Sequence, residues 1–124
     1  VPHTLGDLAR HNCLSLGQQR GWVFRHPETG EIDTLKVGGN FECNDGAVLH
    51  EWALAGRGLA WRSLWEVGRD LGEGRLTSVL DAWQAPPMGI HAVFPQRRHL
   101  PLRVRLFIDL LKENYSNPGY WELR

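Results

Sequence analysis

Asn44 and Asp45 are the residues of this sequence best suited to bind a small ligand. They follow a short extended run and come directly before residues 46–55, whose apolar spacing predicts a helix that ends at Gly56. The first turn of a helix leaves backbone N–H groups free, and these groups attract an anionic ligand. Because the Asp45 carboxylate opposes such an anion, it can instead cap the helix or accept a hydrogen bond from a ligand hydroxyl or amine. Both interpretations stay open.

Trp61 and Arg62 stand where a second short strand, 59–61, is expected to end. The carboxyl ends of strands form the ligand-binding edge of an open α/β sheet. Arg62 can bind a carboxylate with two parallel hydrogen bonds, or it can form an ordinary surface salt bridge. Trp61 fits a core position better than a stacking platform. His91, in an expected strand at 89–94, can sense a ligand or pH, or it can be a structural histidine.

The two cysteines, Cys13 and Cys43, do not indicate an enzyme. Cys13 falls in an expected buried strand, where a thiol is usually inert, and Cys43 adjoins Asn44, which leaves a thiol-sensing role open. The histidines and cysteines form neither a C-x-x-C pair nor an H-E-x-x-H helix, and residues 38–40 make a lone glycine turn rather than a phosphate loop. We therefore expect no catalysis, no metal and no cofactor.

The elements that must position these residues alternate between strands and helices, which predicts an α/β fold. Ser63 and Glu66 form a capping box at the start of one helix, and the turn at 27–30 predicts a β-hairpin. We expect helices at 4–10, 46–55, 63–71 and 101–114, and strands at 13–16, 21–25, 32–37, 59–61, 76–80 and 89–94.

The last expected helix, 101–114, carries two apolar stripes. One stripe can pack on the sheet of the same domain. The other needs a second body, which predicts an oligomer interface. The first stripe contains Leu100, Val104, Phe107, Ile108 and Leu111, and the second contains Leu102, Leu106 and Leu110.

Composition fits one globular domain of 124 residues with 42% hydrophobic and 23% charged residues. Fourteen basic and fourteen acidic side chains cancel, which argues against a free-standing nucleic-acid module. The arginines at 97, 98, 103 and 105 are better explained by a solvated edge or a subunit contact. No apolar run is long enough to span a membrane, no signal peptide starts at Val1, and two cysteines fit a reducing cytoplasm.

Several stretches, in order and with their spacing, resemble the effector-binding domain of LysR-type transcriptional regulators. In that family a helix ends in a Gly-x-Gly turn, a short strand follows, and a further helix leads to a Gly-x-Leu strand. Ser63 departs from the pattern, because the family often has proline there. The stretches are 4–8, 11–14, 53–60, 74–76, 79–80, 90–95, 97–101 and 104–109.

The resemblance implies a periplasmic-binding-protein-like fold with two α/β lobes and a small effector, an anion among the candidates, in the cleft between them. Residues 1–88 would form the second subdomain, and 89–124 the returning crossover strand and C-terminal helix of the first. DNA contact would come only from an N-terminal helix-turn-helix domain that we expect this chain to lack. A solute-binding transport component is the alternative, and a small thiol enzyme a third. The candidate ligand-binding residues are Cys43, Asn44, Asp45, Trp61, Arg62 and His91.

Overall fold

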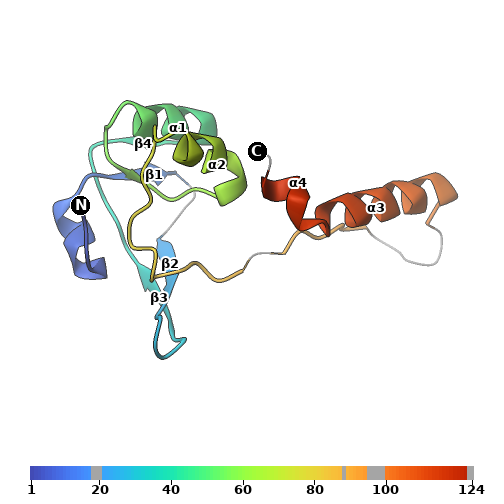
Figure 1. The fold of residues 1–124 in the computed structure, drawn as a ribbon, viewed down its shortest axis with the longest axis horizontal. Helices are drawn as coiled ribbons and strands as arrows, with labels where there is room; N and C mark the ends of the chain where they lie inside the picture. Colours follow the sequence, from blue (N-terminus) through green and yellow to red (C-terminus); the bar gives the residue numbers. More distant parts are fainter. Residues whose placement is uncertain (18–20, 88, 95–99, 123–124) are drawn as a thin grey trace. The chain divides into compact units, whose positions relative to one another are not determined.

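The computed structural model describes residues 1–17, 21–87, 89–94 and 100–122, and the chain forms two units, Val1–Pro87 and Met88–Arg124 (Figure 1). The first unit contains the 3-10 helix η1 (Leu5–Arg10), strands β1 (Cys13–Leu16), β2 (Trp22–Arg25), β3 (Ile32–Leu35), β4 (Glu42–Cys43) and β5 (Leu59–Ala60), and helices α1 (Gly46–Leu54) and α2 (Leu64–Gly72). The second unit contains α3 (Leu102–Tyr115) and α4 (Pro118–Glu122).

A three-stranded parallel sheet, with the order β4-β1-β5, positions the candidate residues. Parallel strands need a crossover, and α1 makes the one from β4 to β5. Because β1 lies between these strands, α1 packs on all three of them. Leu14 of β1 and Leu49 of α1 are fully buried as a result. The sheet therefore holds the start of α1 directly beyond the end of β4.

Strands β2 and β3 form the predicted antiparallel hairpin, with Trp22 opposite Leu35 and Arg25 opposite Ile32. The turn at 27–30 closes on Gly30, whose φ of 71° lies in the left-handed region that glycine adopts without strain. Alternation along β2 turns Trp22 and Phe24 to one side, where they join Leu8 and Cys13 in the core.

Two predicted strands are absent from the described residues. Residues 76–80 form no ladder: Leu80 has a φ of 57°, which breaks an extended conformation, and its side chain packs against the core from a loop. Residues 89–94 are also irregular, with Ile90 66% and Val93 94% exposed. A strand is stabilised only when a neighbouring strand satisfies its backbone, and the described residues supply none to either segment.

The second unit contains α3, the predicted last helix, and one helix that was not predicted. Tyr115 of α3 contacts Tyr120 of α4, with ring centroids 5.2 Å apart. The sequence contains a signal for α4, because asparagine suits an N-cap and Pro118 suits a first helical position. In the structure, the Asn117 Oδ1 accepts a hydrogen bond from the Gly119 N–H at 3.0 Å. Among the described residues, no helix combines the length and the apolar character that crossing a bilayer requires.

Candidate functional site

The carboxyl end of the parallel sheet brings together most of the predicted ligand-binding residues. Leu16 pairs with Cys43, and Leu14 pairs with Ala60, so β1, β4 and β5 all end at the same edge. The Gly17 N–H donates to the Cys43 carbonyl at 2.6 Å and continues this edge by one residue. The residues at the ends of β4 and β5, 43–45 and 61–62 among them, therefore lie at one edge of the sheet.

Asp45 caps α1, as one of the two interpretations of the sequence predicted. The Ala47 N–H donates to its Oδ1 at 2.8 Å, and the Leu49 N–H donates to its backbone carbonyl at 3.2 Å. The half-buried Cys43 places its Sγ 3.2 Å from the same carbonyl. Asn44 is exposed. A ligand-binding role for these residues stays a prediction.

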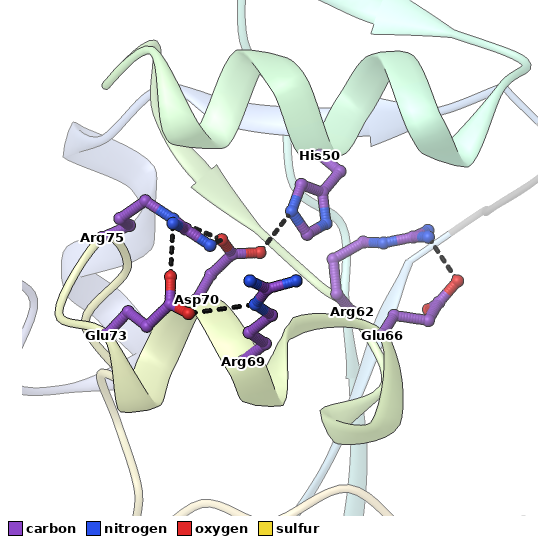
Figure 2. A network of polar contacts seen from close by, with 7 residues as sticks. All are labelled: His50, Arg62, Glu66, Arg69, Asp70, Glu73 and Arg75. Atoms are coloured by element: carbon purple, nitrogen blue, oxygen red, sulfur yellow. Dashed lines mark hydrogen bonds and ion pairs between the residues drawn. The ribbon is translucent and has the colours of Figure 1, made fainter. Parts of the chain in front are cut away.

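The Arg62 side chain lies between the start of α1 and the start of α2 (Figure 2). Its Nη2 donates to Glu66 Oε1 at 2.6 Å, and its side chain is only 14% exposed. The guanidinium lies against Gly46, where an added Cβ would come within 2.7 Å of Nη2. The Nε atom is buried and has no hydrogen-bond partner among the described residues. The interaction with Glu66 is thus a mostly buried ion pair.

Glu66 belongs to this edge, although the sequence analysis gave it only a capping role. Its Oε2 accepts the Ser63 N–H at 3.3 Å, which confirms the predicted capping box, while its Oε1 binds Arg62. The spacing of four residues between Arg62 and Glu66 was the signal for this ion pair.

Trp61 is half-buried and packs against the core. Its ring stacks against Trp22, with centroids 5.9 Å apart, and meets Phe24 edge-on at 4.8 Å. His91 belongs to the second unit, where it is exposed and its ring lies against Gly89. Ligand contacts of Trp61 and His91 stay predictions.

Cys13 lacks the environment of a catalytic thiol. It is fully buried, and burial raises the pKa of its thiol above the ordinary value. Its Sγ is 3.7 Å from the Leu8 carbonyl. A thiol nucleophile needs a lowered pKa and access to a substrate. Within the described part of the chain, no three histidine, cysteine or acidic side chains cluster in a way that could hold a metal ion.

A second polar network joins α1 to α2 (Figure 2). The Asp70 carboxylate is only 11% exposed, and one of its oxygens lies 2.7 Å from His50 Nε2. Its other oxygen accepts from Arg75 Nε at 2.7 Å. The hydrogen bond from Arg75 is the main cause that lowers the pKa of Asp70, and that from His50 adds to it. Arg75 also pairs with Glu73, which binds Arg69 at 2.9 Å. This network fixes α1 against α2 beside the sheet edge.

Comparison with known proteins decides the family. A family model described as the LysR substrate binding domain matches residues 1–116. The chain belongs to this LysR substrate-binding domain family. It is 33% identical over 122 residues to the HTH-type transcriptional regulator PtxR of Pseudomonas aeruginosa, and 29% identical over 120 residues to DmlR of Escherichia coli. These matches cover 96% and 94% of this chain, but it spans only 38% of either relative.

Solved LysR regulatory domains share the fold. The regulatory domain of the C227S variant of AphB from Vibrio vulnificus superposes with a TM-score of 0.78 and 26% identity, over 91% of this chain and 57% of that one. CrgA, a LysR-type transcriptional regulator from Neisseria meningitidis, gives 0.74 and 28%, over 94% of this chain and 40% of CrgA. The predicted periplasmic-binding-protein-like α/β fold is confirmed, and these relatives favour a regulator over the transport alternative.

Proposed function

We propose that this LysR-family chain is the effector-sensing part of a cytoplasmic bacterial transcriptional regulator. The observation that supports this most is the shared carboxyl edge of β1, β4 and β5, where Asn44 and Arg62 follow their strands. A small metabolite bound there, between this lobe and another, acts by binding one state of lobe closure more tightly than the other. DNA contact belongs to a separate helix-turn-helix domain.

The proposed effector is an anion. Arg62 supplies a planar cation, and the start of α1 adds the partial positive charge of its N–H groups. The exposed Asn44 amide provides both a donor and an acceptor. Cys43 and Asp45 belong to the proposed site at this edge, with Asp45 acting through its cap of α1. Trp61 and His91 are kept as predicted ligand contacts.

A thermal-shift screen on a version of the protein with both lobes tests this function. We expect one small metabolite to raise Tm, since a ligand at a hundred times its Kd stabilises the folded state by about 2.7 kcal/mol. Asn44→Ala and Arg62→Ala should each weaken the apparent affinity about tenfold. Glu28→Gln, in the exposed hairpin turn, is the control. A broad screen without a stabilising metabolite, or variants that respond like the wild type, would contradict the proposal.

We also propose that α3 forms an oligomer interface through Leu102, Leu106 and Leu110. These side chains are 67%, 58% and 54% exposed, whereas Val104 and Ile108 are half-buried. Exposed apolar side chains along one helix face are typical of an interaction site.

Self-association of the chain should therefore depend on α3. We expect an oligomer in light scattering at micromolar concentration, and a monomer when Leu102, Leu106 and Leu110 are all replaced by glutamine, because this removes the apolar area that association buries. Lys112→Gln on the same helix should leave the oligomer unchanged. A monomeric wild type would be evidence against this interface.

A further inference from the structure

The guanidinium of Arg62 can donate two parallel hydrogen bonds to one carboxylate, from Nε and Nη2. Among the described residues, only the Nη2 donor has an acceptor. The N–H groups on Nε and Nη2 point to the same side of the planar group, so together they match the two oxygens of a carboxylate. In the structure only Nη2 binds Glu66, through Oε1 at 2.6 Å. The second oxygen of Glu66 faces the Ser63 N–H instead, and Nε has no hydrogen-bond partner among the described residues. A buried donor without an acceptor destabilises the folded state. A carboxylate that binds both Nε and Nη2 would remove this cost.

The surroundings of Arg62 favour an anion. The guanidinium packs on Gly46, the first residue of α1, because glycine leaves room for it there. The partial positive charge at the start of a helix adds to the charge of an adjacent arginine. Asp45 lies next to this position, but its Oδ1 is engaged with the Ala47 N–H. Glu66 is thus the carboxylate that neutralises Arg62.

The ion pair between Glu66 and Arg62 can break at a modest cost in free energy. The Glu66 side chain is 26% exposed, so water can solvate the carboxylate once it leaves the guanidinium. Its contact with the Ser63 N–H at 3.3 Å does not involve Arg62. The capping box can therefore persist while the ion pair exchanges.

We propose that Glu66 is a built-in competitor for the anion site of Arg62, and that the effector carries a carboxylate that displaces Glu66 and engages both Nε and Nη2. This inference rests on the proposed function. The ion pair between Arg62 and Glu66 would then determine which effectors bind. The charge of Glu66 then sets how tightly an effector must bind Arg62. Weak anions fail to displace it.

Glu66→Gln tests the proposal with succinate as the probe. Glutamine is the natural alternative to glutamate in a capping box, so the fold of α2 is retained while the competing charge is lost. Calorimetric titration of the version of the protein with both lobes should show succinate binding about tenfold more tightly to the variant than to the wild type. In NMR spectra, the Arg62 Nε–H signal should shift on binding, because Nε gains an acceptor.

Two further variants distinguish the effect of the paired Nε and Nη2 donors from the effect of a change in net charge. Glu73→Gln is the matched control, since Glu73 caps the end of α2 and pairs with Arg69 and Arg75 rather than with Arg62, and it should leave succinate affinity unchanged. Arg62→Lys combined with Glu66→Gln keeps the cation but loses the paired donors, and the gain should disappear.

Equal affinities in the wild type and Glu66→Gln, equal gains in Glu66→Gln and Glu73→Gln, or an unmoved Nε–H signal would overturn the competitor role. Failure of succinate to bind either protein would overturn the carboxylate assignment. The proposed function is judged separately, because the metabolite screen and its Asn44→Ala variant do not depend on the ligand being a carboxylate.

Discussion

Gly58→Ala should lower the free energy of unfolding of the chain by roughly 3 kcal/mol, the upper end of the usual cost of overpacking. An added Cβ at Gly58 would come within 2.1 Å of the Asn12 backbone oxygen, which is part of the main chain and cannot rotate away. The same oxygen accepts the Leu59 N–H at 2.9 Å, so separating the two segments also breaks the pairing that starts β5 beside β1. Denaturant titration followed by circular dichroism measures the effect.

Gly72→Ala is the control for this substitution. Apart from its chain neighbours and the backbone of its own helix, none of the described residues has an atom within 4 Å of a Cβ at Gly72, the last residue of α2. Alanine also favours a helix more than glycine does. We expect this variant to be as stable as the wild type or slightly more stable. If the two alanine variants unfold at the same denaturant concentration, the close contact between Gly58 and Asn12 does not limit stability.

Asp70→Asn should lower Tm by several degrees at neutral pH, because it removes the charge that holds His50 and Arg75. The pKa of Asp70 in the folded chain lies below its ordinary value, and the hydrogen bond from Arg75 is the main cause. The stabilisation from the ionised carboxylate is therefore complete above the unfolded-state pKa of about 3.9. It is lost as the pH falls through the lower folded-state pKa.

Melting curves from neutral pH to about pH 2 check this expectation. The difference in Tm between wild type and Asp70→Asn should be largest near neutral pH and should shrink towards the acid end. Asp109→Asn, at an exposed position of α3, makes the same chemical change and should follow the wild type throughout. A constant difference between wild type and Asp70→Asn across this range would show that the ionisation of Asp70 does not stabilise the fold.

Local signals predicted the elements at the candidate site well. Asp45 caps α1, Ser63 and Glu66 form the capping box of α2, and Gly30 closes the hairpin turn. Each of these depends on neighbours within a few residues, so the sequence pattern contains both partners. The residues after β4 and β5 lie at one edge of the sheet, because both strands run parallel to β1.

The strand predictions at 76–80 and 89–94 were wrong for a physical reason. Apolar residues indicate that a segment is buried or needs a partner, but a strand forms only where another strand offers its hydrogen bonds. Leu80 is packed against the core from a loop with a positive φ, and no local pattern indicates that conformation for leucine.

The sequence by itself determined the class of fold, the caps and turns, and the residues that reach the carboxyl edge of the sheet, because short-range hydrogen bonding and apolar spacing decide these features. Only the tertiary structure decided that the Arg62 guanidinium packs on Gly46, with Nε lacking an acceptor among the described residues. It also decided that His50 contacts Asp70 and that Gly58 packs against the Asn12 backbone. Gly46, Asp70 and Asn12 each lie far along the sequence from their partner, and only the packing of the helices and strands between them brings the two together.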